Sequence, residues 1–381
     1  MKKRLFLLLY LITNGLQAQS DTLTVFFGGD LMVHKPQLTS ARIHQNTYDF
    51  SESFLFLKPL FARADFVILN LETTISKHKF SGYPRFASPS ALIRDTRKAG
   101  INVLMTANNH SADRGYYGLR TTLDYLDKYK IKHTGTFRSK NERKTNNSLI
   151  INKKGIKLAI LNYTYGINNL PYPHPGIINL IDTLRMKRDI QNARLQNPDE
   201  IIVFLHWGTQ YRTKPDRFQK QIRRFLQKQG IRIIIGSHPH VVEPVIYEND
   251  SLTAFSLGNF LSNQRTFPRD GSIILYIKWI KTANKTRIAE AGYIPIWVYK
   301  YVQGNTTHFE ILPVDEFMRF KAYFLSDKDF HKMLRFNLYV NRMLRHSGLH
   351  RGLEFIPVSQ LPHLKPYEIS KAGRPEARFT R

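Results

Sequence analysis

Five short apolar segments constrain the fold of this chain more than any other feature of its sequence. They span residues 23–27, 65–69, 101–105, 201–205 and 231–235. Each is a nearly continuous apolar run instead of an alternation of apolar and polar residues, which is typical of strands buried on both faces. Helical patterns separate the segments, and strands that alternate with helices predict an α/β fold.

The predicted helices follow these strands along the chain. They are expected between Ser90 and Gly100, over 116–126, over 184–195 and over 218–226, where Gly230 ends the last one. A further strand is expected at 157–162, and the Asn- and Lys-rich stretch 138–147 is expected to be a surface loop.

The pattern changes after residue 241. Closely spaced strands, several of them antiparallel, are expected at 242–247, 252–257, 272–280 and 293–299. A helix is then expected to begin at the N-cap Ser326 and to end at Gly348, with an apolar face formed by Phe330, Met333, Leu334 and Leu338. The last thirty residues are expected to form a loosely packed basic tail.

Charge and cysteine content narrow the classes of function. The chain has 57 Lys and Arg against 29 Asp and Glu, a formal net charge of +28, which attracts polyanions such as nucleic acid, anionic lipid head groups and acidic polymers. It has no cysteine, which excludes disulfides, thiolate metal sites and thiol catalysis. Neither a Gly-x-Ser-x-Gly nucleophile turn nor a phosphate-binding Gly-x-x-x-x-Gly-Lys loop occurs in the sequence.

The first eighteen residues have the layout of a secretory signal peptide. Lys2, Lys3 and Arg4 precede the short apolar stretch 5–12, and Leu16-Gln17-Ala18 resembles a cleavage site. We therefore expect cleavage after Ala18 and export to the periplasm or cell envelope. Export argues against nucleic acid as a partner, whereas an anionic cell-surface polymer and a membrane surface remain candidate partners.

Residues that can bind a metal ion follow the five apolar strands. They are Asp30, Glu72, Asn109 with His110, His206, and His238 with His240. Ligands of open α/β sheets bind beyond the carboxyl ends of the strands, so these side chains are expected to converge. Imidazole and carboxylate without thiolate suit Mn, Fe or Zn, held as one or two ions. Taken singly, Asp30 is equally well explained as a helix cap, Glu72 as a partner of Arg85, and Asn109 as a turn residue.

Six ordered motifs then form a recognisable series. They are Gly29-Asp30-Leu31-Met32, Asn70-Leu71-Glu72, Ala107-Asn108-Asn109-His110, His206-Trp207-Gly208, Gly236-Ser237-His238-Pro239-His240-Val241 and Ser256-Leu257-Gly258-Asn259-Phe260. The series closely resembles the CapA family of capsule and poly-γ-glutamate biosynthesis proteins, a branch of the calcineurin-like metallophosphoesterase superfamily. The resemblance covers residues 22–265. Residues 266–320 are expected to be a β-strand extension packed on this domain, and residues 321–381 a C-terminal helix and basic tail.

The resemblance implies a four-layer α/β sandwich of the metallophosphoesterase type with a site for divalent metal ions. Asp30 and His240 would bind the first metal ion, Glu72 would bridge both ions, and Asn109, His206 and His238 would bind the second. His110 would be the general acid, oriented by Asp113, and Asn108, Gly258 and Asn259 would line the substrate pocket. The Asp-x-His opening of the superfamily is absent, and His34 is the nearest candidate to replace its histidine.

Two classes of function follow from the resemblance. The first is a metal-dependent hydrolase or transferase that acts on a phosphoester or an anionic cell-surface polymer, with capsule-synthesis membrane proteins as candidate partners. The second is a non-catalytic accessory protein that binds an acidic polymer during export, which the missing histidine and the basic composition favour.

Overall fold

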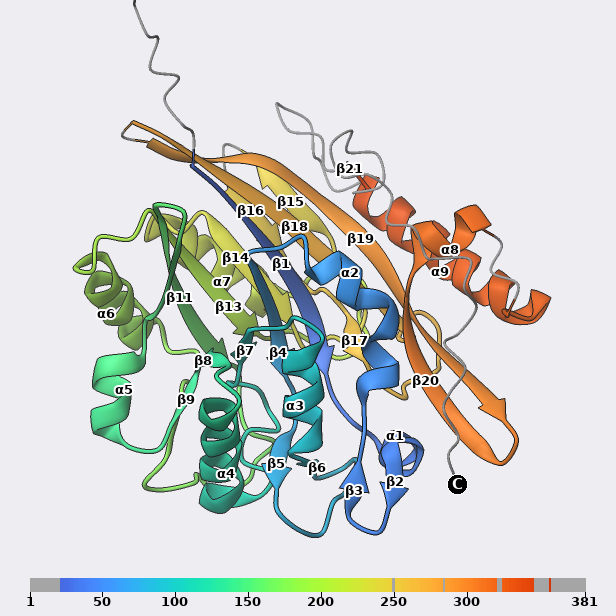
Figure 1. Cartoon of the computed structure of the whole chain (residues 1–381). Helices are drawn as coiled ribbons and strands as arrows, with labels where there is room; N and C mark the ends of the chain where they lie inside the picture. Colours follow the sequence, from blue (N-terminus) through green and yellow to red (C-terminus); the bar gives the residue numbers. More distant parts are fainter. Residues whose placement is uncertain (1–20, 249–250, 284, 321–323, 346–355, 358–381) are drawn as a thin grey trace, which may run out of the picture.

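Two β-sheets lie face to face at the centre of the molecule, and helices cover the outer face of each (Figure 1). The computed structural model describes residues 21–248, 251–283, 285–320, 324–345 and 356–357. The order of layers is helix, sheet, sheet, helix. This arrangement confirms the expected four-layer α/β sandwich.

The first sheet has a parallel half and an antiparallel half. Its order is β20 (Thr306–Pro313), β19 (Lys285–Gln303), β18 (Gly271–Thr282), β1 (Asp21–Leu31), β4 (Phe66–Leu71), β7 (Val103–Met105) and β8 (Lys132–Thr134), with β17 (Asn259–Leu261) on β1 and β21 (Ile356–Pro357) on β19. The strands from β1 to β8 are parallel, and β18 pairs antiparallel with β1. Residues 271–313 therefore continue this sheet.

The second sheet is smaller. Its order is β10 (Leu149–Lys153), β11 (Ile156–Thr164), β13 (Glu200–His206), β14 (Ile233–Ser237), β16 (Ser251–Ala254) and β15 (Val245–Glu248), with β11, β13, β14 and β16 parallel. Three short pairs complete the strands: β2 (Arg42–His44) with β3 (Thr47–Tyr48), β5 (Thr74–Ser76) with β6 (Ala87–Pro89), and β9 (Thr136–Phe137) with β12 (Ile177–Ile178).

The continuous apolar runs follow from burial on both faces of the sheets. On β1, Val25 and Phe27 face the core between the sheets, whereas Phe26 faces the helices outside. On β13, Phe204 lies between the sheets and Val203 packs under the outer helices. Each such side chain contributes about 1.5–3 kcal/mol when fully buried, so both layers select apolar residues at successive positions.

Two sets of helices form the outer layers. The 3₁₀ helix Ser51–Leu57, α2 (Lys58–Phe61), α3 (Ala91–Lys98) and α4 (Gly115–Lys128) cover the first sheet, and α6 (Thr183–Arg194) and α7 (Arg217–Lys228) cover the second. The remaining helices of the described residues are α1 (Lys35–Ala41), α5 (Lys140–Asn146), α8 (Val314–Phe320) and α9 (Asp327–Arg345).

The predicted loop over 138–147 is wrong, because α5 forms there. Ser139 caps the helix by accepting a hydrogen bond from the Glu142 backbone N–H at 3.2 Å. The Arg138 guanidinium pairs with the Glu142 carboxylate at 2.6 Å. A serine cap followed three residues later by a glutamate is a helix-start pattern, and the helix buries none of its residues, so it lacks an apolar stripe.

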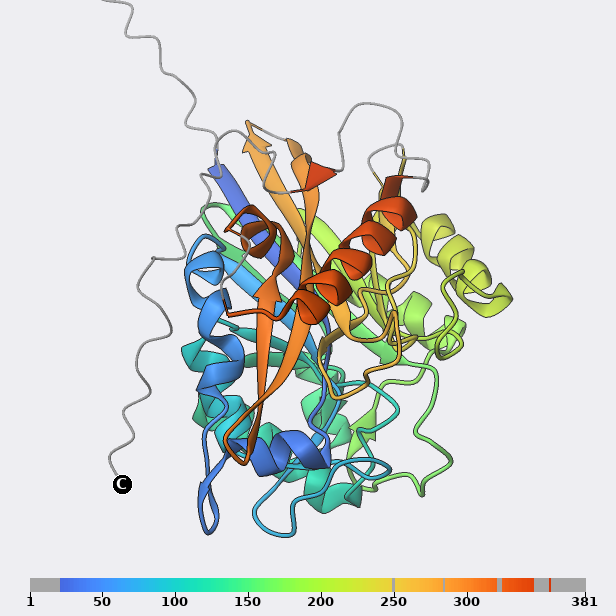
Figure 2. The same cartoon turned by 90° about the vertical axis from the view of Figure 1, so that its right-hand side faces the viewer.

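The C-terminal helix α9 lies across the part of the first sheet that the second sheet does not cover (Figure 2). It begins one residue after Ser326, whose hydroxyl accepts the Asp329 N–H at 3.1 Å. Met333, Phe336 and Val340 join the core between the sheets. Leu338, predicted to be on the apolar face, is 61% exposed, because the buried face of α9 is rotated away from it.

Several predictions fall outside the described residues. They are the signal peptide 1–18, the helix end at Gly348 and the basic tail, of which only residues 356–357 are described. Within the described ranges, no helix combines the length and the apolarity that crossing a membrane requires.

Candidate metal centre

The predicted metal-binding side chains meet where the parallel strands of both sheets end. Asp30 lies near the end of β1, Glu72 directly follows β4, and His206 is the last residue of β13. His238 and His240 follow β14. All of them are at most 3% exposed, so the carboxyl edge of the two sheets forms a buried cluster of imidazole and carboxylate groups.

Close approach of two backbone segments fixes Asp30. The Asp30 N–H donates to the Gly258 carbonyl at 2.9 Å, and the pairing of β1 shifts register at this position. A Cβ at Gly29 would lie 1.9 Å from the same carbonyl oxygen, so glycine is required beside Asp30. Gly258 thus acts through its backbone carbonyl, which fixes the position of the Asp30 backbone and so of its carboxylate.

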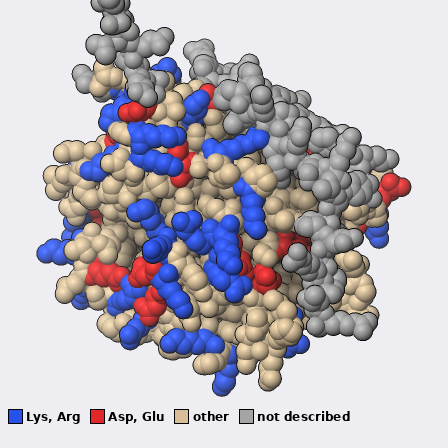
Figure 3. Space-filling model, in the orientation of Figure 1, with Lys and Arg blue, Asp and Glu red and all other residues tan. Residues whose placement is uncertain are grey.

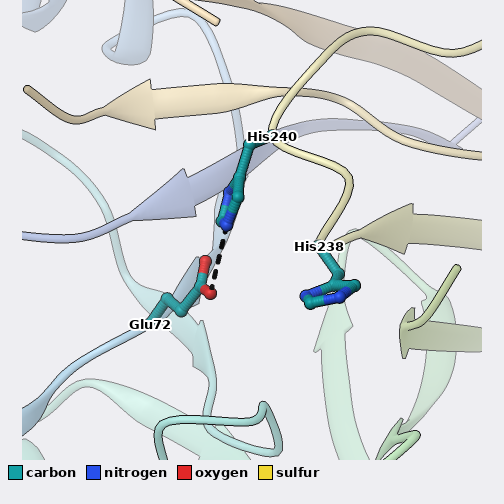
Figure 4. Close-up of side chains that lie close together, drawn as sticks. All are labelled: Glu72, His238 and His240. Carbon is teal, nitrogen blue, oxygen red and sulfur yellow. Dashed lines mark ion pairs between the residues drawn. The ribbon is translucent and has the colours of Figure 1, made fainter. Parts of the chain in front are cut away.

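The turn after β14 holds two histidines in an uncommon backbone conformation. His238 has φ +102° and His240 has φ +60°, a region that non-glycine residues adopt rarely and that concentrates at functional sites. The Pro239 carbonyl between them accepts the Tyr211 N–H at 2.8 Å. As Figure 4 shows, His240 and Glu72 point toward each other, and His238 projects from the same turn.

The distances between donor atoms divide the cluster into two groups that share Glu72. One group is Asp30, Glu72 and His206, and the other is Glu72, His238 and His240; within each, the ligand atoms lie within 4.8 Å of one another. Glu72 Oε1 is 3.5 Å from His206 Nε2 and 3.8 Å from His240 Nε2. Glu72 therefore stands between the two groups.

Asn109 joins the cluster through His206. Its Oδ1 is 2.7 Å from His206 Nε2, and His238 Nδ1 is 3.0 Å from the same nitrogen. On the other side, Asp30 Oδ2 is 3.1 Å from His240 Nδ1. Ligands bonded to one ion at about 2.0–2.2 Å lie roughly 3 Å apart, so the spacings around His206 Nε2 suit metal coordination, whereas Asp30 Oδ2 can accept a hydrogen bond from His240 Nδ1.

Side chains outside the cluster contact the Nδ1 atoms of two of its histidines. Ser237 Oγ lies 3.0 Å from His206 Nδ1 and 3.4 Å from the Leu205 carbonyl, so it can accept from the imidazole and donate to the carbonyl. Asn259 Oδ1 lies 3.1 Å from His240 Nδ1. A proton on His240 Nδ1, which among the described residues faces only the oxygens of Asn259 and Asp30, leaves a lone pair on Nε2, the nitrogen that faces Glu72.

The Glu72 carboxylate provides the test of whether a metal ion fits. It is fully buried, and neither oxygen has a hydrogen-bond partner in the described structure. Burial, with Asp30 and Asp113 nearby, raises the pKa of Glu72 well above its usual value, and burial lowers the pKa of His206 and His238. A divalent cation would reverse the cost of burying these groups, and the nitrogen and oxygen donors suit Mn, Fe or Zn.

His110 lies outside the two groups and has a different set of contacts. Its Nδ1 is 2.8 Å from Asp113 Oδ2, and the same carboxylate oxygen accepts the Phe86 N–H at 2.6 Å. The Phe86 ring meets the imidazole edge to face at 4.6 Å. Asp113 therefore orients His110 and leaves its Nε2 available for proton transfer.

The remaining predicted residues support the cluster or lie beside it. Asn108 Nδ2 donates to the Leu71 carbonyl at 2.7 Å, which ties the end of β4 to the segment that carries His110. Asn259 contacts His240, as described above. His34 is not part of either metal-binding group: its Nδ1 accepts from the Asn263 N–H at 3.4 Å, and burial lowers its pKa to about 4.

Sequence reasoning missed three side chains of the site. Asn70 Nδ2 donates to Asp30 Oδ1 at 2.8 Å, within the first sheet. The same nitrogen lies 3.2 Å from Nδ1 of His206, the last residue of β13 in the second sheet, so Asn70 contacts both sheets. Ser237 fixes His206, and the Tyr165 ring lies 4.5 Å from the His238 ring. Asn70 and Ser237 both lie inside the ordered motifs, which were the only sequence signal that could have identified them as residues of the site.

Asn259→Ala is expected to weaken metal binding by about 10- to 100-fold, because His240 Nδ1 loses one of the two oxygens that orient the ring, and the remaining one belongs to Asp30, itself a proposed metal ligand. Titration of the chelator-treated protein with Mn²⁺ or Zn²⁺ measures this affinity. Asn152→Ala, at an exposed position of β10, is the matched control. Equal affinities of the two variants would show that Asn259 does not orient His240.

Known proteins resemble this chain in sequence and in fold. The family model described as bacterial capsule synthesis protein PGA_cap matches residues 24–264. The capsule biosynthesis protein CapA of Bacillus anthracis is 24% identical over 272 residues, which cover 68% of this chain and 64% of that protein. The PGA biosynthesis protein CapA of Bacillus subtilis (strain 168) is 27% identical over 267 residues, 67% of this chain and 68% of that protein. The match thus spans slightly less than two thirds of the first relative.

Two solved structures share part of the arrangement. A putative 5'-nucleotidase from Staphylococcus aureus, in complex with alpha-ketoglutarate, has a TM-score of 0.48 at 12% identity and covers 84% of this chain and 58% of its own. The calcineurin-like phosphoesterase YfkN from Bacillus subtilis has a TM-score of 0.44 at 11% identity and covers 85% of this chain and 98% of its own.

Proposed function

We propose, from the premise that the chain belongs to the bacterial capsule synthesis protein family PGA_cap, that it is a metal-dependent hydrolase or transferase acting on an anionic cell-surface polymer. The membership confirms the family that the ordered motifs indicate. The single observation that carries the proposal is the Glu72 carboxylate, which is fully buried, lacks a hydrogen-bond partner in the described structure and faces Nε2 of His206 and His240.

The residues of the cluster would hold one or two divalent ions. Asp30 and His240 would hold the first, Asn109, His206 and His238 the second, and Glu72 would bridge them. Such ions lower the pKa of a water molecule and polarise the bond that is attacked. The other parts of the reaction fall to the protein's own side chains, which orient the substrate and move protons.

His110 is the proposed proton donor. In hydrolysis the attacking water gives up a proton and the leaving atom gains one, the oxygen of a phosphoester or the nitrogen of a γ-linked amide, so a donor beside the leaving group balances the reaction. Asp113 accepts from His110 Nδ1 and so directs the opposite nitrogen toward the site. In a transferase the attacking group is a hydroxyl or amine of a second substrate, and His110 has the same role.

Surface charge supports an anionic substrate. The face that carries α2 and α3 shows many more Lys and Arg than Asp and Glu side chains (Figure 3). Lys58, Arg97 and Lys98 are among its exposed residues. The net charge of +28 raises the local concentration of polyanions, whether they carry carboxylates or phosphates.

Elemental analysis and a hydrolysis assay test the proposed function. The purified protein is expected to contain at least one equivalent of a divalent metal and to cleave an aryl phosphodiester or a γ-linked glutamate oligomer. Chelator treatment should abolish cleavage, and Mn²⁺, Fe²⁺ or Zn²⁺ should restore it. Full activity after removal of all metal would contradict the proposal.

The basic surface also favours the second candidate, an accessory protein that binds an acidic polymer without cleaving it. That function predicts salt-sensitive binding of the polymer that His238→Ala leaves unchanged. Export from the cytoplasm, a membrane surface and capsule-synthesis membrane proteins as partners remain predictions for both candidates.

A further inference from the structure

An arginine beside the metal centre has no acidic partner in the described structure. The Arg269 guanidinium lies 3.4 Å from the centre of the Tyr211 ring, and none of its N–H groups forms a hydrogen bond or ion pair with a described residue. The adjacent acid, Asp270, accepts the Trp297 indole N–H at 2.8 Å instead. Stacking occupies the face of the guanidinium and leaves its N–H edge available.

Two hydrogen bonds accepted by backbone carbonyls attach this stacked pair to the metal centre. The Arg269 carbonyl accepts from Asn259 Nδ2 at 2.8 Å, and Asn259 Oδ1 contacts His240. The Tyr211 N–H donates to the Pro239 carbonyl, and the Tyr211 ring centre lies 6.0 Å from that of His240. Arg269 and Tyr211 are therefore held next to His240 from two directions.

The C-terminal helix α9 supports the segment that carries Arg269. Phe267 packs edge to face on Tyr339 at 5.5 Å, and the Arg335 guanidinium lies 3.9 Å from the Phe267 ring centre. The Tyr339 hydroxyl donates to the Val242 carbonyl, in the turn that follows His240, at 2.7 Å. A helix beyond the matched family region thus braces both sides of the stacked pair.

The chemistry of this pair indicates an anion. A fixed guanidinium presents parallel N–H groups that match the two oxygens of a carboxylate. Tyr211 is 40% exposed, so the pair is in contact with solvent. Asp216, on the same segment as Tyr211, is engaged by Thr209 and Gln219 and does not neutralise Arg269.

We propose that Arg269, stacked on Tyr211, is a specificity-determining residue that binds a carboxylate of a polyanionic substrate next to the unit at the metal centre. The proposal deepens the proposed function and rests on it. Each unit of a γ-linked glutamate chain carries one free carboxylate, so a chain with one unit at the metal ions presents another to Arg269.

The test measures the affinity of a γ-linked glutamate hexamer by calorimetry. Arg269→Gln is expected to weaken binding about 10-fold or more, as expected for the loss of a hydrogen-bonded charge pair. Arg224→Gln, at an exposed position of α7, removes the same charge and should change the affinity less than 2-fold. Equal affinities of the two variants overturn the proposal.

Two further variants keep the result decisive if Arg269→Gln unfolds. Arg269→Lys keeps the charge but loses the planar pair of donors, and Tyr211→Ala removes the stacking surface; both should weaken hexamer binding. Wild-type affinity in both variants overturns the proposal. Inorganic phosphate serves as a second probe, and a loss of phosphate affinity without a loss of hexamer affinity also overturns it.

These titrations separate the two proposals. A wild-type protein that lacks metal and activity contradicts the proposed function, whereas hexamer binding that depends on Arg269 still supports the subsite. A metal-loaded, active protein whose hexamer affinity and KM are insensitive to Arg269 contradicts only the subsite.

Discussion

His206→Ala should remove bound metal and activity together. The His206 imidazole is fully buried and lies within 3.5 Å of ligand atoms from Glu72, Asn109 and His238. Loss of residues that merely support metal ligands lowers metal affinity about 10- to 100-fold, so loss of a ligand is expected to exceed about 100-fold. Elemental analysis and aryl phosphodiester hydrolysis measure the two effects.

Two comparisons decide the meaning of this result. His44→Ala, at an exposed position of β2, should retain metal and activity. Chelator treatment should lower the melting temperature of the wild type more than that of His206→Ala, because the variant has less bound metal to lose. If His206→Ala keeps the wild-type metal content and full activity, His206 is not a metal ligand.

The parallel strands could be predicted because consecutive apolar residues in each segment indicate burial on both faces of the sheet. Val25, Phe26 and Phe27 are apolar in succession since one core lies on each side of β1. The strand ends then follow from the polar residue after each run. The general convergence of Asp30, Glu72 and His206 needs only the rule that parallel strands end at one edge.

Other parts of the fold depend on contacts that local sequence does not record. The strand β18 pairs antiparallel with β1 in a register that places Thr22 opposite Ile280. These two residues are far apart along the chain, so the assembled sheet decides their pairing. The exposure of Leu338 also could not be predicted from local sequence, because the orientation of α9 depends on how Met333 and Phe336 pack against the sheet.

The supporting residues of the site could not be assigned for the same reason. Asn259 contacts His240 because β17 pairs with β1 so that Asn259 lies opposite Asp30. Arg269 reaches the site because its carbonyl is bound by Asn259 and its side chain stacks on Tyr211. None of these distances follows from spacing along the chain.

His110→Gln is expected to lower the rate of hydrolysis by about 10²- to 10⁴-fold when the leaving group is a poor one such as an alkyl alcohol. The variant removes the proton donor that Asp113 holds at 2.8 Å. A nitrophenyl leaving group departs without full protonation, so its rate should fall much less. His110 lies outside both metal-binding groups, so the metal content should not change.

The matched control for this prediction is another histidine–aspartate pair. His133 Nε2 lies 3.0 Å from Asp127 Oδ1 at the surface, and His133→Gln should leave both rates unchanged. Asp113→Asn should reproduce part of the His110→Gln effect, since the imidazole keeps its place but loses the partner that orients it. An equal loss of rate on alkyl and nitrophenyl substrates would mean that His110 binds the substrate instead of protonating the leaving group, because only proton donation depends on the basicity of the departing oxygen.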